Sequence, residues 1–341
     1  MSDLRAPFPY FGGKRRAAPI IWAALGDPGG YVEPFAGSAA VLLGRPTFTG
    51  RRVETINDAD GWLVNTWRAI RLSPAEVAHH AAGPVTEIDY HARLAWLQER
   101  RTDGLVSWLE GDPEAHDAKA AAWWLYVAAC GIGDPWGAGP WRVIDGHLRD
   151  ARTVAPGRRG EGDTPGVNRK LPHLGDAGKG IRRKLPHLGN AGQGEHESRL
   201  STYMARLSQR LAHVRITAGD WRRVLTPSAS RARTGGDGST AIFLDPPYAT
   251  SGDLYAHSEH GIAEQVREWC QSAPRDLRIV LCGYDDEHDA LLSYGWTVAQ
   301  GKAGGGAGYS TRADNGRRER LWLSPACLRG QDALDFEGLG A

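Results

Sequence analysis

The chain has 341 residues, of which 41% are hydrophobic and 24% are charged; these values exclude a wholly disordered chain and predict about two domains, or one domain with a large insertion. The longest apolar stretch, Ala120–Cys130, is well short of the roughly 20 residues of a membrane span, and the N-terminus lacks the pattern of a secretory signal, so we expect a cytoplasmic protein without membrane association. The net charge of +1 hides a strong asymmetry between the middle of the chain and its ends.

The first predicted elements form a βαβ unit. PYFGGKRR (Pro9–Arg16) reads as a glycine-rich loop that accepts an anion or a carboxylate, or alternatively as a mobile terminus. Val32–Leu43 reads as the end of a strand, a turn of small residues and the start of a helix. VETIND (Val53–Asp58) follows as a second strand at the distance that a crossover helix requires.

Residues 61–130 show helical spacing, with clear segments at Leu94–Leu109 and Ala118–Cys130. This pattern predicts a helical subdomain. The tryptophans of this part and of the region after it, among them Trp123, Trp124, Trp136 and Trp141, favour packing over base stacking.

From Gly131 to Gly194 glycine, proline and arginine dominate, and regular periodicity disappears. RKLPHLGDAGKG (Arg169–Gly180) recurs as RKLPHLGNAGQG (Arg183–Gly194), with ten of twelve positions identical. Residues 142–233 contain 19 Lys and Arg against 8 Asp and Glu, and the remainder contains 22 against 32. A basic block of this kind attracts polyanions, of which nucleic acid is the commonest in the cytosol; the alternative is a solvated flexible loop.

The last part of the chain alternates strands with helices. After a helix at Ser198–His213, the sequence predicts strands at VRITAGDW and AIFL, a helix at Ile262–Ser272, a strand at LRIVLCGY and a helix at Glu287–Tyr294. WTVAQ and RERLWLS then predict a terminal hairpin. The fold class is therefore α/β, a doubly wound, mainly parallel, Rossmann-like sheet with an inserted helical and loop domain.

Asp245-Pro246-Pro247-Tyr248 follows directly after the buried strand AIFL. In open α/β sheets ligands bind beyond the carboxyl ends of the strands. Two prolines stiffen the turn and remove two N–H donors, which leaves the Asp245 carboxylate and the Pro246 carbonyl as acceptors for an amino group. Tyr248 can stack on the base that carries this group. A tight turn with a capping aspartate is the alternative.

Glu33-Pro34-Phe35-Ala36-Gly37-Ser38 follows the first strand. Gly37 between small residues lets the backbone approach a ligand, and Phe35 supplies an apolar wall. The chain has neither GxGxxG nor a GxxxxGK[ST] phosphate loop, so a nucleoside without phosphates fits better. Asp58 ends the next strand, where it either holds ribose hydroxyls or caps a helix.

Four widely spaced cysteines, Cys130, Cys270, Cys282 and Cys327, predict buried free thiols. His173 and His187 occur one per repeat without a cysteine partner, so we expect no metal site.

PYFGGK, YVEPFAGSAAVLL, NDAD, AGDW and LDPPY occur in one order across nearly the whole chain. In these segments the sequence closely resembles the Dam-like class of DNA adenine-N6 methyltransferases, which use S-adenosylmethionine. The resemblance implies a site-specific enzyme acting on double-stranded DNA in the cytoplasm of a bacterium or of a phage-infected bacterium, with or without a restriction endonuclease as partner.

The resemblance also assigns roles to individual residues. It implies that Asp245–Tyr248 form the catalytic motif. The implied cofactor-binding residues are Tyr10, Gly12, Lys14, Glu33, Pro34, Phe35, Ala36, Gly37, Ser38, Asp58 and, in AGDW, Asp220, which would contact the cofactor adenine. The implied domains are residues 1–60 with 214–329 for catalysis, residues 61–213 for target recognition, and a flexible tail at 330–341.

The chain departs from this family in its middle, where GIGDPWGAGPW and the arginine-rich repeats replace a short hairpin, so the resemblance carries no target sequence. We interpret the repeats as paired loops that contact DNA phosphates; a disordered spacer is the alternative. The predicted DNA-binding residues are Arg169, Lys170, Arg182, Arg183 and Lys184.

Three functions follow from this interpretation. The first is methylation of adenine N6 in a base flipped out of duplex DNA. The second keeps the transfer but changes the acceptor to RNA adenine or cytosine N4. The third is a catalytically silent DNA-binding module. Asp245 at the first motif position favours adenine, and the intact DPPY motif favours an enzyme.

Overall fold

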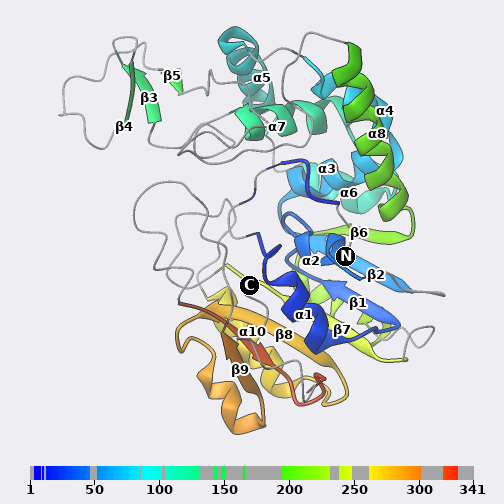
Figure 1. The fold of residues 1–341 in the computed structure, drawn as a ribbon, viewed down its shortest axis with the longest axis vertical. Coiled ribbons are helices and arrows are strands. Elements are labelled where there is room, and N and C mark those ends of the chain that lie inside the picture. Colours follow the sequence, from blue (N-terminus) through cyan, green and yellow to red (C-terminus); the bar gives the residue numbers. More distant parts are fainter. Residues whose placement is uncertain are drawn as a thin grey trace. The chain divides into compact units, whose positions relative to one another are not determined.

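The contacts in a computed structural model divide the chain into two units (Figure 1). The first unit comprises Met1–Ala6, Tyr10–Val64 and His213–Ala341, and the second comprises Pro7–Pro9 and Asn65–Ala212. The structure describes residues 4–8, 10, 13–46, 52–83, 86–101, 104–130, 141–144, 147–150, 164–165, 194–230, 238–247, 261–300 and 318–328.

The first unit is built on a mixed, mostly parallel sheet of seven strands in the order β6-β2-β1-β7-β8-β10-β9. The α/β class predicted from the sequence is therefore confirmed. The predicted terminal hairpin is also confirmed, since β10 pairs antiparallel with β9 as well as with β8. The strands are β1 (Gly30–Glu33), β2 (Val53–Asp58), β6 (Val214–Ala218), β7 (Thr240–Leu244), β8 (Arg278–Tyr284), β9 (Thr297–Gln300) and β10 (Glu319–Leu323).

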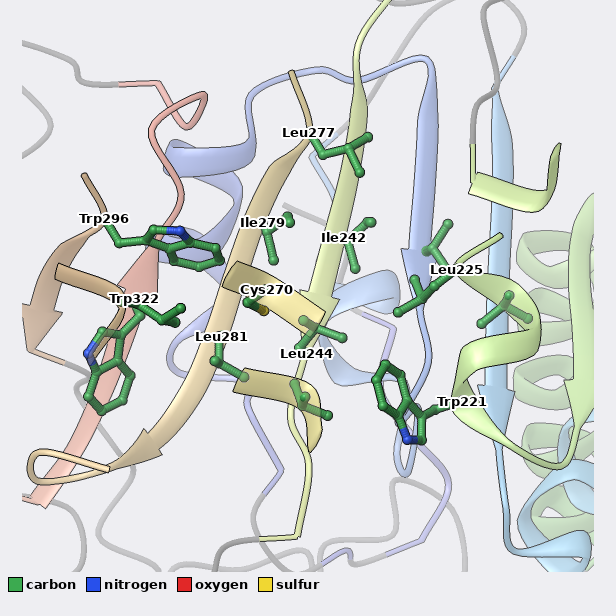
Figure 2. Packing of buried hydrophobic residues seen from close by; sticks show 14 residues of the cluster. Trp221, Leu225, Ile242, Leu244, Cys270, Leu277, Ile279, Leu281, Trp296 and Trp322 are labelled. Carbon is green, nitrogen blue, oxygen red and sulfur yellow. The ribbon is translucent and has the colours of Figure 1, made fainter. Parts of the chain in front are cut away.

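Apolar side chains on one face of this sheet form a hydrophobic core of the unit (Figure 2). Successive residues of a strand face opposite sides, so β7 contributes Ile242 and Leu244 to this core and turns Phe243 to the other face. Cys270 and Val266 of α10 pack on the core. Helices cover this face of the sheet. Those in the described residues are η1 (Trp221–Val224), α9 (Pro227–Ser230), α10 (Ile262–Ser272) and η3 (Asp289–Tyr294).

The helix predicted at Glu287–Tyr294 is a shorter 3₁₀ helix, η3, which starts only at Asp289. Its start is delayed because residues 285–288 form a turn. Asp285 there adopts a positive φ of 49°, a conformation that L-residues rarely continue into a helix.

The aromatic ring of Tyr31 marks the opposite face of the sheet. It lies 4.8 Å from the ring of Trp22, which belongs to α1 (Ala18–Leu25). Trp22 Nε1 donates to the carbonyl of Val41 at 2.8 Å, and Val41 belongs to α2 (Ala40–Leu43). Helices therefore flank the sheet on both faces.

The strand order of the sheet changes direction between β1 and β7. From β1 the chain proceeds to β2 and β6 on one side and to β7 and β8 on the other, and all five strands are parallel. In open α/β sheets such a switch point leaves a crevice at the carboxyl ends of the two central strands. Glu33 ends β1 and Asp245 follows β7, so both lie at this crevice.

The second unit is mainly helical. Phe8 belongs to it because its ring packs against those of Trp67 and Trp124, at 5.5 and 5.1 Å between centroids. A small antiparallel sheet of order β4-β3-β5 is also present. The elements are α3 (Gly61–Leu72, which starts in the first unit), α4 (Pro74–Ala81), α5 (Glu87–Glu99), α6 (Gly104–Gly111), α7 (Ala118–Cys130), α8 (Gly194–Leu211), β3 (Trp141–Ile144), β4 (His147–Asp150) and β5 (Thr164–Pro165).

Several details of the second unit differ from the sequence prediction. The segment Leu94–Leu109 is divided between α5 and α6, with Gly104 starting the second helix. The region 131–194, predicted without regular structure, contains β3, β4 and β5. Its short strands escaped prediction because they lack a long alternating pattern. The repeated LPHLG segments lie outside the described residues.

All four cysteines are free and buried, as the sequence predicted. In the described part of the chain, no helix combines the length and the apolar character that crossing a membrane requires.

Candidate active site

A cavity of about 530 Å³ opens at the crevice between β1 and β7. Its walls come from the N-terminal segment, the loops after β1, β2, β6 and β7, and the start of α10. The size is within the range of pockets that hold a nucleoside-sized ligand. The lining residues that the sequence singled out are Tyr10, Lys14, Glu33, Pro34, Phe35, Ala36, Gly37, Ser38, Asp58, Asp220, Asp245 and Pro247.

The loop after β1 brings its backbone close to the cavity. Gly37 has a φ of +47°, which favours glycine. A Cβ at this position would collide with the ring of Tyr10, so the absence of a side chain allows Tyr10 to lie against the loop. Ala39 also has a positive φ, of 48°, directly before α2. The loop is thus held in a strained, tight conformation at the cavity wall.

Asp58, at the end of β2, braces this loop. Its Oδ2 accepts the N–H of Gly37 at 2.8 Å, and its Oδ1 accepts the N–H of Asp60 at 2.9 Å. Burial raises the pKa of Asp58 to about 7, against the opposing effect of these backbone donors. Asp60, not Asp58, caps the following helix, since Asp60 Oδ1 accepts the N–H of Trp62 at 2.8 Å.

Glu33 is a buried carboxyl group on the cavity wall, with only 2% of its surface exposed. Its Oε2 accepts the hydroxyl of Tyr31 at 2.9 Å and the N–H of Leu42 at 3.2 Å. Burial, aided by the nearby Asp245 carboxylate, raises the pKa of Glu33 to about 8 against the opposing effect of the hydrogen bonds from Tyr31 and Leu42. At neutral pH the protonated form of Glu33 is therefore favoured.

The DPP turn places Asp245 beside Lys14. Lys14 Nζ lies 2.8 Å from Asp245 Oδ2, and both side chains line the cavity. Burial by itself lowers the pKa of Lys14. The combined attraction of Asp245, Cys282 and Glu319, with the hydrogen bond to Asp245, outweighs this effect, so the net pKa lies above its ordinary value. Lys14 is thus a cation at neutral pH. Pro247 lines the cavity, whereas the side chain of Pro246 is buried and lies outside the lining.

Aromatic rings form the wall near Asp220. The ring of Phe35 lies 5.9 Å from that of Trp221, and Trp221 packs edge-on against Trp269 at 6.3 Å. Asp220 Oδ1 accepts the N–H of Arg222 at 2.8 Å, which starts η1. The guanidinium of Arg222 covers Trp221 at 4.7 Å and donates to Gln265. The wall therefore combines apolar ring faces with a carboxylate at the rim.

The predicted site residues have different outcomes. Twelve line one cavity, as given above. Gly12, Tyr248 and the five basic residues Arg169, Lys170, Arg182, Arg183 and Lys184 lie outside the described residues. The sequence assigned no site role to several lining residues: Asp60, Trp221, Arg222, Phe243, Ile262 and Gln265. Of these, Asp60 and Trp221 lie within the motifs NDAD and AGDW, whereas Ile262 and Gln265 come from α10 and carry no local motif.

Among the described residues, no group of His, Cys, Asp and Glu is arranged to hold a metal ion. No protein-family model matches the sequence, and a comparison with curated proteins finds no match.

Proposed function

We propose that this chain transfers a methyl group from S-adenosylmethionine to N6 of an adenine in double-stranded DNA. The observation that carries the proposal is the common cavity. Asp245, Lys14 and the loop Glu33–Ser38 come from separate parts of the chain and line one space at the switch point of the sheet. An arrangement with Asp245 and Lys14 in separate places would have argued against the proposal.

The residues of the cavity fit a nucleoside with a charged tail and no phosphates. The ring of Phe35, which packs against Trp221 and lines the cavity, offers an apolar face for an adenine. The Asp58 carboxylate interacts with the backbone N–H groups of Gly37, Ala59 and Asp60. Its two oxygens offer about four acceptor sites in all, which leaves capacity for a ribose hydroxyl. Lys14 supplies a cation for a carboxylate. These residues would hold S-adenosylmethionine.

When bound, S-adenosylmethionine supplies an activated methyl group on a sulfonium sulfur. The chain's own task is to hold an amino nitrogen in line with that methyl group. Asp245 and the Pro246 carbonyl accept the two N–H groups and stabilise the positive charge that develops on nitrogen. In this arrangement the nitrogen would take up the methyl group as the carbon–sulfur bond breaks, and it would then release one proton to water.

The proposal that DNA is the partner depends on the charge of the repeats and not on the geometry of the site. The basic residues of the repeats are suited to phosphate contacts. Such contacts offset the few kcal/mol that unstacking a flipped base costs. Deleting Arg169–Gly194 should abolish retention on DNA and leave affinity for S-adenosylmethionine intact. Unchanged methylation kinetics with an unchanged salt dependence would contradict this role.

The proposal is tested by sequencing DNA from cells that express the chain and lack other adenine methylation, with a method that detects N6-methyladenine at base resolution. We expect methylated adenines within one short sequence, and none in cells expressing D245A. The purified protein is then supplied with S-adenosylmethionine and duplex DNA, RNA, or DNA in which only cytosine carries an amino acceptor.

The outcomes separate the three functions. Transfer to duplex adenine supports the proposal. Transfer to RNA or cytosine favours the second function, and DNA binding without transfer favours the silent module. Either result would overturn the proposal as stated.

A further inference from the structure

Glu319 contacts the candidate active site through Lys14. Lys14 Nζ lies 2.9 Å from Glu319 Oε1 and 2.8 Å from Asp245 Oδ2, so the ammonium sits between two carboxylates. The side chain of Lys14 is 6% exposed and that of Glu319 is 8% exposed. Lys14 and Asp245 line the cavity, whereas Glu319 lies outside its lining.

The reversed direction of β10 explains how Glu319 reaches this place. β10 runs antiparallel to β8, with Glu319 opposite Tyr284 at the carboxyl end of β8. The first residue of β10 therefore lies at the edge of the sheet where the parallel strands end. Trp322 packs in the core of Figure 2, and because side chains alternate along a strand, Glu319 faces the opposite side.

Building on the proposed function, we infer that Glu319 is a positioning residue that keeps Lys14 paired when the carboxylate of Asp245 accepts the amino group of the target base. A buried ammonium that loses its partner is strongly destabilising. With Asp245 as its sole carboxylate, Lys14 would compete with the incoming amino group. The carboxylate of Glu319 removes that competition, because the Lys14 ammonium keeps an anionic partner while Asp245 accepts a hydrogen bond from the base.

Among the described residues, titratable groups face Lys14 from several elements around it. Asp245 follows β7, Glu319 starts β10, and Cys282 and Tyr284 belong to β8. Burial raises the pKa of both the Cys282 thiol and the Tyr284 hydroxyl, so these two groups are neutral at pH 7. The charges that balance Lys14 are therefore the two carboxylates, and loss of either lowers the pKa of Lys14.

The experiment compares E319Q and E319D with a matched control. Glu54 is also buried, at 4% exposure, and does not line the cavity. It pairs with Arg45 at 2.9 Å, so E54Q reports the general effect of losing a buried carboxylate. For E319Q we expect kcat to fall by about tenfold or more, with Kd for S-adenosylmethionine within about twofold. The alkaline limb of its pH–rate profile should move to lower pH. E319D should restore much of kcat, and E54Q should leave it unchanged.

Acylation of lysines gives a readout that does not depend on methyl transfer. The native proteins are treated with an amine-acylating reagent at pH 8, and Lys14 is quantified by mass spectrometry against the half-buried Lys119. We expect Lys14 to be protected in the wild type and in E54Q, and to react about tenfold faster in E319Q as its amine loses charge and partner.

The outcomes are distinguishable. A wild type that methylates DNA, with E319Q matching it in kcat and in Lys14 protection, overturns the inference. Equal losses of kcat in E319Q and E54Q overturn it as well, because the role would then be merely structural. A wild type that transfers no methyl group to nucleic acid defeats the proposed function, and the acylation of Lys14 still decides whether Glu319 holds it. Should E319Q fail to fold, E319D is tested by the same two readouts. Faster acylation of Lys14 together with a kcat below that of the wild type supports the inference, and wild-type values of both overturn it.

Discussion

The N–H of Gly37 donates to Asp58 Oδ2 at 2.8 Å. This hydrogen bond joins the loop after β1 to the end of β2, so one carboxylate fixes the wall of the cavity as well as facing into it. The bracing role and a role toward ribose hydroxyls are compatible, because a carboxylate has about four acceptor sites and the backbone N–H groups of Gly37, Ala59 and Asp60 occupy at most three of them.

D58A should weaken binding of S-adenosylmethionine by about tenfold or more, because it leaves the N–H groups of Gly37 and Asp60 without this acceptor at about 1–3 kcal/mol each. D58N retains one oxygen and should lose less. Isothermal titration calorimetry measures both. The matched control is D112A, since Asp112 Oδ1 accepts the N–H of Glu114 at 2.8 Å in a similar turn away from the cavity. Equal affinities for D58A and D112A would contradict the assignment.

G37A should lower affinity for S-adenosylmethionine by about tenfold. A residue with a side chain costs about 1–2 kcal/mol at this φ of +47°, and its Cβ would collide with the ring of Tyr10. The comparison variant is G111A at the end of α6, where an added Cβ meets nothing within 4 Å. G111A should bind as the wild type does. A G37A protein with unchanged affinity and melting temperature would show that the loop is not held as described.

E33Q should change how stability depends on pH. Because the pKa of Glu33 is raised from 4.5 to about 8, the folded protein keeps a proton that the unfolded chain releases between these values. The contribution of Glu33 to stability is therefore full below pH 4.5 and is lost as pH rises to about 8, by up to about 1.4 kcal/mol per pH unit.

Glutamine keeps an acceptor for Tyr31 and Leu42 but does not ionise, so E33Q should gain stability relative to the wild type as pH rises through this window. Urea unfolding at several pH values measures the difference, in which the similar titration of Asp58 cancels. Two stability curves that run parallel from pH 5 to pH 8 would show that Glu33 does not titrate as its burial predicts.

The four cysteines should not react with a water-soluble thiol reagent in the native protein. Each is buried, and burial raises the pKa values of Cys270 and Cys282, so thiolate is scarce at neutral pH. Colorimetric titration should find all four thiols in denaturant and essentially none without it. Rapid reaction of one thiol in a protein that is still fully folded would contradict the burial of that cysteine.

The sequence predicted the sheet well because its strands are short apolar runs bounded by turns. β2 at Val53–Asp58 and α10 at Ile262–Ser272 begin and end where the pattern indicates. The motif residues also converge as expected, since carboxyl ends of parallel strands share one edge. The sequence could not predict contacts that depend on the order in which the strands pair in the sheet. Glu319 reaches Lys14 only because β10 is reversed and inserted beside β8.

The same limit applies to the cavity wall. Gln265 and Arg222 meet there from α10 and η1, and no local pattern predicts which residue of an amphipathic helix will face a pocket. The short strands β3, β4 and β5 were missed for another reason, since two to four residues carry too little periodicity to be recognised.

The parallel pairing of β2 with β6 also bears on how the chain acquires its fold. Asn57 and Thr217 share a hydrogen bond across 160 positions of sequence, and a ribosome adds about 5–20 residues per second. β1 and β2 must therefore wait roughly 8–30 s during synthesis before β6 emerges. The helices encoded in between have this interval in which to fold first, while the earliest strands still lack the later strands that cover their edges.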